Sequence, residues 1–175
     1  MASGGARATS GPPPSEGSGR SDLRGFKLNS IPASGYRGRI PRFPLPERRV
    51  TRWVYEDKSR FEVVDVDATA EFRARETAMW KWAWRTPQAS VWARPEYSYL
   101  QQLVARWVRQ AVLCESASSS AAHHGQLHRY AEQIGMTPAG LTRLGWKIVN
   151  DGPLRVRPQP VGNVVEMQPA RRLRG

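Results

Sequence analysis

Cysteine and histidine are scarce in this chain of 175 residues, which contains one cysteine and three histidines. The single thiol, Cys114, forms no internal disulfide and supplies no thiolate cluster for a metal. His124 and His128 are four residues apart in a predicted helix, but no nearby carboxylate or cysteine completes a metal shell. We therefore expect no metal site, no cofactor and no catalytic residues, and interpret the protein as a non-enzyme.

Nucleotide-binding loops and long apolar runs are also missing from the sequence. It contains neither G-x-x-x-x-G-K-[ST] nor G-x-G-x-x-G, so it predicts neither a P-loop nor a dinucleotide site. No run approaches the roughly 18 apolar residues of a membrane span, and the first residues lack the apolar centre of a secretion signal. We expect a soluble intracellular protein without a membrane partner.

Acidic residues are the minority, with 15 Asp and Glu against 27 Lys and Arg and a net charge of +12. Residues 1–60 hold 12 Lys and Arg against 5 Asp and Glu, residues 61–150 hold 10 against 8, and residues 151–175 hold 5 against 2. Basic ends favour a polyanionic partner, although they can also serve solubility alone. The candidate DNA contacts are Arg37, Arg39, Arg42, Arg48, Arg49, Arg143, Lys147, Arg171, Arg172 and Arg174.

Proline and glycine divide the chain into four segments. Residues 1–30 are rich in Gly, Ser and Pro and predict a disordered tail. Residues 31–66 predict an extended Pro-rich arm that lies across a folded surface, followed by a β-hairpin with its turn at residues 57–59. Residues 67–150 predict a helical oligomerisation core, and residues 151–175 a basic C-terminal tail.

Four helical patterns make up the predicted core. The first covers about 68–85, with Asp67 or Thr69 as its cap. The second covers about 95–115 and has the clearest apolar period. The third covers about 123–135, and the fourth begins at Thr137-Pro138 and ends near residue 150, with Ile148 on its core face. The expected fold class is mainly α, a small helical bundle.

The last two predicted helices are joined by Gly135-Met136-Thr137, which is typical of a helix-turn-helix pair. In a DNA reader, the second helix of such a pair would present Thr142, Arg143 and Lys147 to the major groove. An ordinary hairpin of two helices fits the same spacing.

Tryptophan is abundant, with seven residues. Such large apolar side chains indicate either a core or a contact surface for another subunit. The candidates for the core or the oligomer contact are Trp80, Trp82, Trp84, Trp92, Trp107 and Trp146.

Three segments resemble the small subunit of terminases from double-stranded DNA phages of actinobacteria. They are Gly35–Leu45 (GYRGRIPRFPL), Trp80–Ala89 (WKWAWRTPQA) together with Trp92, and Ile134–Trp146 (IGMTPAGLTRLGW). The second segment is the most specific. Residues 50–66 lie outside the pattern of this family.

The resemblance implies a non-catalytic genome-packaging factor in the host cytoplasm. It implies a homo-oligomeric ring of about eight to twelve copies that binds viral double-stranded DNA and recruits or regulates the large ATPase and nuclease subunit. Two alternatives stay open. One is a helix-turn-helix transcriptional regulator that binds an operator as a dimer, and the other is a structural protein without a nucleic-acid role.

Overall fold

The structure is a computed structural model that describes residues 27–150. About half of these residues are helical, and two small two-stranded sheets accompany the helices. The helices are α2 (Val66–Ala83), α3 (Ala89–Trp92), η1 (Pro95–Tyr97), α4 (Leu100–Cys114), α5 (Ala121–Gln133) and α6 (Pro138–Arg143). The strands are β1 (Asn29–Pro32), β2 (Val50–Glu56), β3 (Ser59–Asp65) and β4 (Trp146–Val149).

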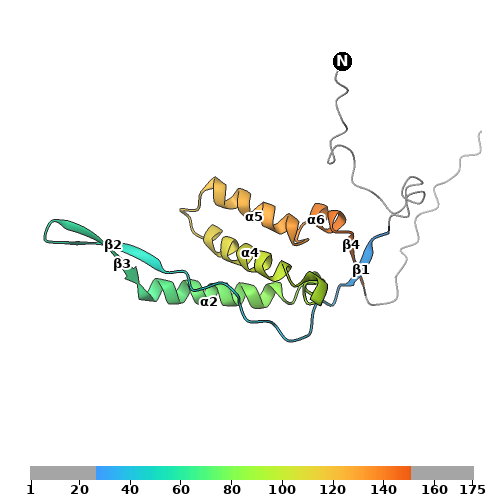
Figure 1. The fold of residues 1–175 in the computed structure, drawn as a ribbon. Helices are drawn as coiled ribbons and strands as arrows, with labels where there is room; N and C mark the ends of the chain where they lie inside the picture. The colour runs from blue at the N-terminus through green and yellow to red at the C-terminus, as the bar shows by residue number, and fades with distance from the viewer. Residues whose placement is uncertain (1–26, 151–175) are drawn as a thin grey trace, which may run out of the picture.

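The long helices lie side by side, with α4 between α2 and α5 and in contact with both (Figure 1). Helix α6 and the β1–β4 pair lie at one end of this layer. The β2–β3 hairpin projects from the opposite end, where it runs directly into α2. None of the helices within residues 27–150 is long and apolar enough to cross a lipid bilayer.

The hairpin predicted over residues 50–66 is present. Strands β2 and β3 pair antiparallel, and Asp57 and Lys58 form its two-residue turn with φ of 46° and 63°. Positive φ at both central residues matches the twist of the flanking strands, which is why such tight turns suit hairpins.

Helix α2 is capped by Asp65, whose side chain accepts a hydrogen bond from the Ala68 amide at 3.0 Å. The predicted caps, Asp67 and Thr69, are therefore wrong. Thr69 instead accepts a hydrogen bond from the Val50 amide at 2.9 Å, which ties the base of the hairpin to the first turn of the helix. Asp67 lies in that first turn, where a negative charge complements the helix dipole.

The connection from α5 to α6 follows the predicted local signals. Gly135 adopts φ of +78°, and the side chain of Thr137 caps α6 by accepting from the Gly140 amide at 3.0 Å. Pro138 is the first helical residue, where its missing N–H costs nothing. A Cβ on Gly140 would lie 2.4 Å from the Glu132 carbonyl oxygen, so only glycine allows α6 to approach α5 this closely.

The predicted fourth helix is wrong beyond Arg143. The chain turns at Gly145, with φ of +74°, and residues 146–149 form β4, which pairs parallel with β1. Lys147 therefore lies on a strand, and Ile148 is 43 % exposed instead of facing the core. Asn29 and Ser30, which we assigned to a disordered tail, belong to β1.

The tryptophans form an aromatic core inside one chain. Trp84 packs edge-to-face against Trp80 and Trp92, with ring centroids 5.4 and 6.1 Å apart. Trp146 is buried against Tyr97, with centroids 5.8 Å apart. Of the six candidates, Trp80, Trp84, Trp92, Trp107 and Trp146 are buried, so the structure assigns them to the core. Trp82 is the exception, because 54 % of it is exposed.

Candidate nucleic-acid interface

The Pro-rich arm, residues 33–49, lies across α2 and α4, as its apolar residues predicted (Figure 1). Side chains of the helical layer hold it by donating hydrogen bonds to its backbone carbonyls. The bonds are Trp80 Nε1 to Pro41 O at 2.8 Å, Arg85 Nη1 to Tyr36 O at 3.1 Å and to Gly38 O at 3.3 Å, and Arg109 Nη2 to Pro46 O at 2.5 Å. Because the contacts reach backbone atoms, they fix the path of the arm without using its arginine side chains.

Phe43 anchors the middle of the arm. Its ring is buried and meets Trp80 edge-on, with centroids 5.2 Å apart and planes at 85°. The guanidinium of Arg73 lies 4.8 Å from the centre of the Phe43 ring, within the range of a cation–π contact. The arm is therefore attached to α2 by an aromatic residue as well as by hydrogen bonds.

A buried carboxylate lies beneath this anchor and was missed by the sequence analysis. The Glu76 side chain has no exposed surface, and it bonds both Arg73, at 3.2 Å, and Arg109, at 2.5 Å. The available signal was a glutamate four residues before Trp80, on the face of α2 that also carries Ala83. A carboxylate in that place needs cations around it, since burying an unpaired charge is very costly.

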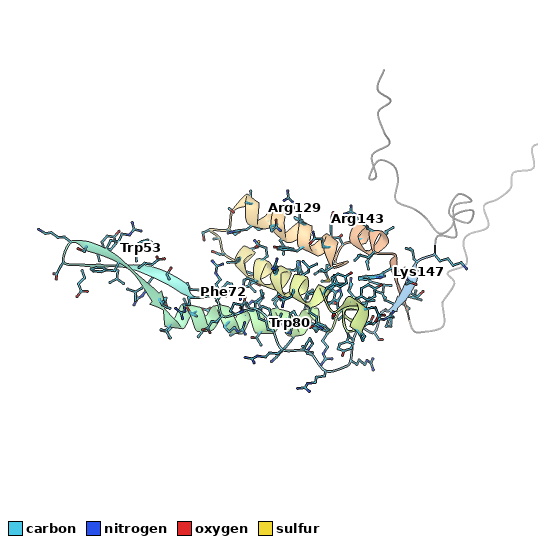
Figure 2. The ribbon with its side chains drawn as sticks, viewed as in Figure 1. Trp53, Phe72, Trp80, Arg129, Arg143 and Lys147 are labelled. Carbon is cyan, nitrogen blue, oxygen red and sulfur yellow. The ribbon has the colours of Figure 1, made fainter. Side chains whose placement is uncertain are left out.

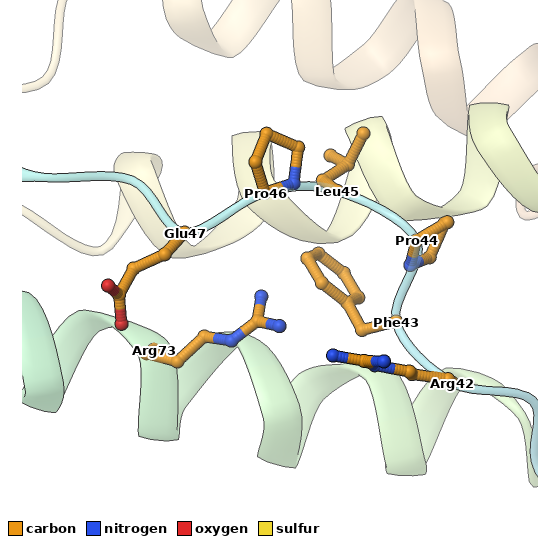
Figure 3. Close-up of a pocket in the computed structure, with 7 residues that line it drawn as sticks. All are labelled: Arg42, Phe43, Pro44, Leu45, Pro46, Glu47 and Arg73. Carbon is orange, nitrogen blue, oxygen red and sulfur yellow. The ribbon is translucent and has the colours of Figure 1, made fainter.

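An open groove of about 760 Å³ runs between the arm and α2. Its floor includes Phe43 and Trp80, and no carboxylate lines it. Figure 3 shows an adjoining pocket, which is lined by residues 42–47 and Arg73. In it, the guanidinium groups of Arg42 and Arg73 extend toward one another beside the Phe43 ring, and Glu47 lies at the far end. The cations that line the groove are Arg42, Arg73, Lys81 and Arg85.

The remaining arginines of the arm are on its surface. Arg37 and Arg39 are exposed, and no carboxylate within residues 27–150 pairs with them or with Arg42. Arg49 is exposed too, and the guanidinium of Arg48 lies 5.6 Å from the centre of the Phe72 ring. The five predicted DNA contacts of the arm are therefore all exposed, on one segment whose anchor, Phe43, is buried.

Arg143 and Lys147 do not join this segment. Arg143 is 63 % exposed in its side chain and lies 3.4 Å from Glu132, while Lys147 is half-buried in β4. Figure 2 shows Arg129 and Arg143 on the α5–α6 side of the helices and Trp80 on the other. The structure thus separates the predicted contacts into two surfaces; Arg171, Arg172 and Arg174 lie outside the described residues.

The histidines face solvent. His123, His124 and His128 are all exposed, and the ring of His124 lies 2.8 Å from the hydroxyl of Ser119. Within the part of the chain that the structure describes, no group of three or more His, Cys, Asp or Glu side chains is placed to hold a metal ion.

The chain matches no protein-family model, no curated protein and no solved structure. The candidate interface therefore stands on its own geometry. Its features are an arm fixed through its backbone, exposed arginines without carboxylate partners, and a groove lined by four cations.

Proposed function

We propose that this protein is a terminase small subunit, a non-catalytic factor that binds viral double-stranded DNA and recruits or regulates the large ATPase and nuclease subunit. The observation that carries the proposal is the anchored arm with Arg37, Arg39 and Arg42 exposed and unpaired by acids. The resemblance of three sequence segments to this family supports the packaging role.

Arginine suits such a surface because its planar guanidinium contacts phosphate oxygens through two parallel hydrogen bonds. Contacts to phosphates give affinity and position without reading base sequence. Lys81 and Arg85 lie beside Arg42 in the same groove, so a phosphate backbone that enters it meets several cations. In a ring of about eight to twelve copies, each weak contact is repeated by every subunit, which raises the overall affinity.

We propose that α5 and α6 form a helix-turn-helix-like pair that packs within the chain. This pair supports the alternative function, an operator-binding regulator, less well than it supports packing within the chain. Helix α6 has six residues, so it is about 9 Å long. Thr142 donates back to the Pro138 carbonyl at 3.1 Å, and Arg143 bonds Glu132 at 3.4 Å. Few side chains on α6 are therefore left for base readout.

A comparison of two charge variants tests the DNA-binding role. The arm variant carries Arg37→Gln, Arg39→Gln and Arg42→Gln. The control carries Arg94→Gln, Arg106→Gln and Arg129→Gln, which removes the same charge from exposed positions elsewhere. Fluorescence anisotropy with duplex DNA should show a much larger loss of affinity for the arm variant, with the slope of log K against log salt reduced by about 2 to 3.

Equal losses for the two variants would mean that only net charge matters and would reject the arm as the interface. Light scattering on the unmodified protein tests assembly independently. A closed particle of about eight to twelve copies fits the terminase proposal, whereas a stable dimer favours the regulator. A protein that ignores duplex DNA at low salt contradicts both.

A further inference from the structure

Exposed apolar side chains are concentrated on the β2–β3 hairpin. Nine large hydrophobic residues of the described chain are exposed, and six of them lie between residues 53 and 66. Exposed apolar residues that gather in one element mark an interaction surface, whereas singly scattered residues do not. Five of these lie on the hairpin, namely Trp53, Tyr55, Phe61, Val63 and Val64, and the sixth, Val66, is the first residue of α2.

The strand register distributes these residues over two faces of the hairpin. Paired residues share a face, so Val54 and Phe61 lie on one side, and Tyr55 and Arg60 lie on the other with Trp53. The guanidinium of Arg60 lies 3.8 Å from the centre of the Trp53 ring and 5.8 Å from that of Tyr55. The face that carries Trp53 and Tyr55 is therefore an exposed aromatic surface. Of these residues, 52 % of Trp53 and 73 % of Tyr55 is exposed.

An isolated two-stranded hairpin is only marginally stable in water, so this one needs a cover. Its charge does not favour DNA as that cover, because the hairpin as a whole holds more acids than bases and the face of Trp53 and Tyr55 carries one of each, Arg60 and Glu62. Over residues 50–65 the acids Glu56, Asp57, Glu62 and Asp65 outnumber the cations Arg52, Lys58 and Arg60. A basic protein surface complements the hairpin better than a nucleic acid does.

The rest of the described chain is basic overall. Outside the hairpin, residues 27–150 hold 16 Lys and Arg against 7 Asp and Glu. Helices α2 and α4 also form an apolar hollow of about 440 Å³. In it, Trp82 is 54 % exposed and stacks on Trp107, with centroids 6.2 Å apart. Arg75 lines the hollow, held by Glu115 at 2.6 Å.

We infer that the hairpin of one copy of this chain seats Trp53 and Tyr55 on the Trp82 hollow of a second copy. The two surfaces are different parts of the chain, so the contact is heterologous and each copy can both give and receive a hairpin. Repetition closes into a ring when the rotation between neighbours permits. The inference rests on the proposed ring assembly and names the contact that builds it.

Complementation between two defective variants tests the contact. The hairpin variant carries Trp53→Ala and Tyr55→Ala, and the hollow variant carries Trp82→Ala. Each alone should lose the oligomer, with at least about a tenfold weaker association, because aromatic anchors dominate interfaces. Mixed together, they should give a one-to-one dimer and nothing larger, since one intact hairpin and one intact hollow remain. Tyr99→Ala, at a position 60 % exposed outside both surfaces, should keep the full oligomer.

The outcomes separate the inference from the proposed function when circular dichroism confirms that each variant is folded. An oligomeric parent whose variants keep their mass overturns the hairpin contact and leaves the ring standing. A parent that is monomeric by sedimentation overturns the ring, and the contact with it. A hairpin variant that keeps its mass but loses DNA affinity assigns the hairpin to DNA and overturns the inference.

A cross-link locates the same contact directly. Tyr55→Cys and Ala78→Cys, each introduced into a separate Cys114→Ser protein, place one thiol on the hairpin and one on the hollow. Oxidation of the mixture should yield a disulfide-linked dimer of the two proteins. Tyr99→Cys in place of Tyr55→Cys provides the matched control, and equal cross-linking by both pairs would contradict the contact.

Discussion

Glu76 and Arg109 form an ion pair in which the carboxylate is fully buried and Arg109 Nε lies 2.5 Å from Glu76 Oε1. The same guanidinium donates to the Pro46 carbonyl, so one side chain connects α4, α2 and the end of the arm. The pair therefore links the stability of the helices to the position of the arm that we propose as the DNA contact.

We predict that Glu76→Ala lowers the free energy of unfolding by about 3–5 kcal/mol, because it leaves Arg73 and Arg109 without their buried partner. Urea unfolding followed by tryptophan fluorescence measures the loss. Glu115→Ala is the control, since it breaks the pair between Arg75 and Glu115 on the surface, where solvent screens the charges. Similar urea midpoints for the two variants would show that the buried ion pairs of Glu76 stabilise the protein no more than the surface pair does.

The indole nitrogens of Trp84 and Trp92 provide a second, matched comparison. Trp92 Nε1 donates to the Ile134 carbonyl at 3.0 Å, while Trp84 Nε1 is buried without a partner in the described chain. Both side chains are almost fully buried. Replacement by phenylalanine removes a hydrogen bond only at Trp92 and leaves a buried carbonyl there unsatisfied.

We therefore predict that Trp92→Phe destabilises the protein by about 1–3 kcal/mol more than Trp84→Phe does. Thermal melting and urea titration of both variants give the difference. Equal losses would indicate that cavity formation alone controls the cost at both sites.

Local signals in the sequence were sufficient for several elements. The alternating residues around Asp57-Lys58 predicted the hairpin, and Thr137-Pro138 predicted the start of α6, because turn and cap geometry depends on a few neighbouring residues. The apolar residues of the arm likewise predicted that it covers a folded surface, although not which carbonyls the helices would hold.

Contacts between distant segments explain why the sequence did not predict β4 or the role of each tryptophan. The spacing of Leu141, Leu144 and Ile148 suggested a longer fourth helix, but β4 forms there because β1, at the other end of the described chain, pairs with it. The β-branched Ile148 and Val149 favour a strand once a partner exists. The tryptophan spacing also could not separate core from interface, since that distinction depends on where the arm and α5 pack.

Alanine substitution of Gly35, with Gly125 as the control, tests how closely the arm approaches the end of α2. Gly35 adopts φ of +73°, and a Cβ there would lie 2.2 Å from the Arg85 carbonyl oxygen. Because this oxygen belongs to the backbone, it cannot move aside as the end of a flexible side chain could. We predict that Gly35→Ala detaches the start of the arm, lowers stability and increases proteolysis between residues 33 and 49. Gly125→Ala, in the exposed part of α5 with no atom within 4 Å of the added Cβ, should instead raise stability by about 0.5–1 kcal/mol. A resistant arm in Gly35→Ala would contradict the tight approach to Arg85.

The arm and the C-terminal arginines can be compared as contacts to one duplex. Neutralising Arg171, Arg172 and Arg174 should reduce DNA affinity more at low salt than at high salt, because phosphate contacts release counterions on binding. If arm and tail contact separate phosphates, the losses in the salt slope for the tail variant and for the arm variant should add in the combined protein. Anisotropy titrations at several salt concentrations measure all three slopes. A tail variant whose affinity falls equally at every salt concentration would show that these arginines act other than through phosphate contacts.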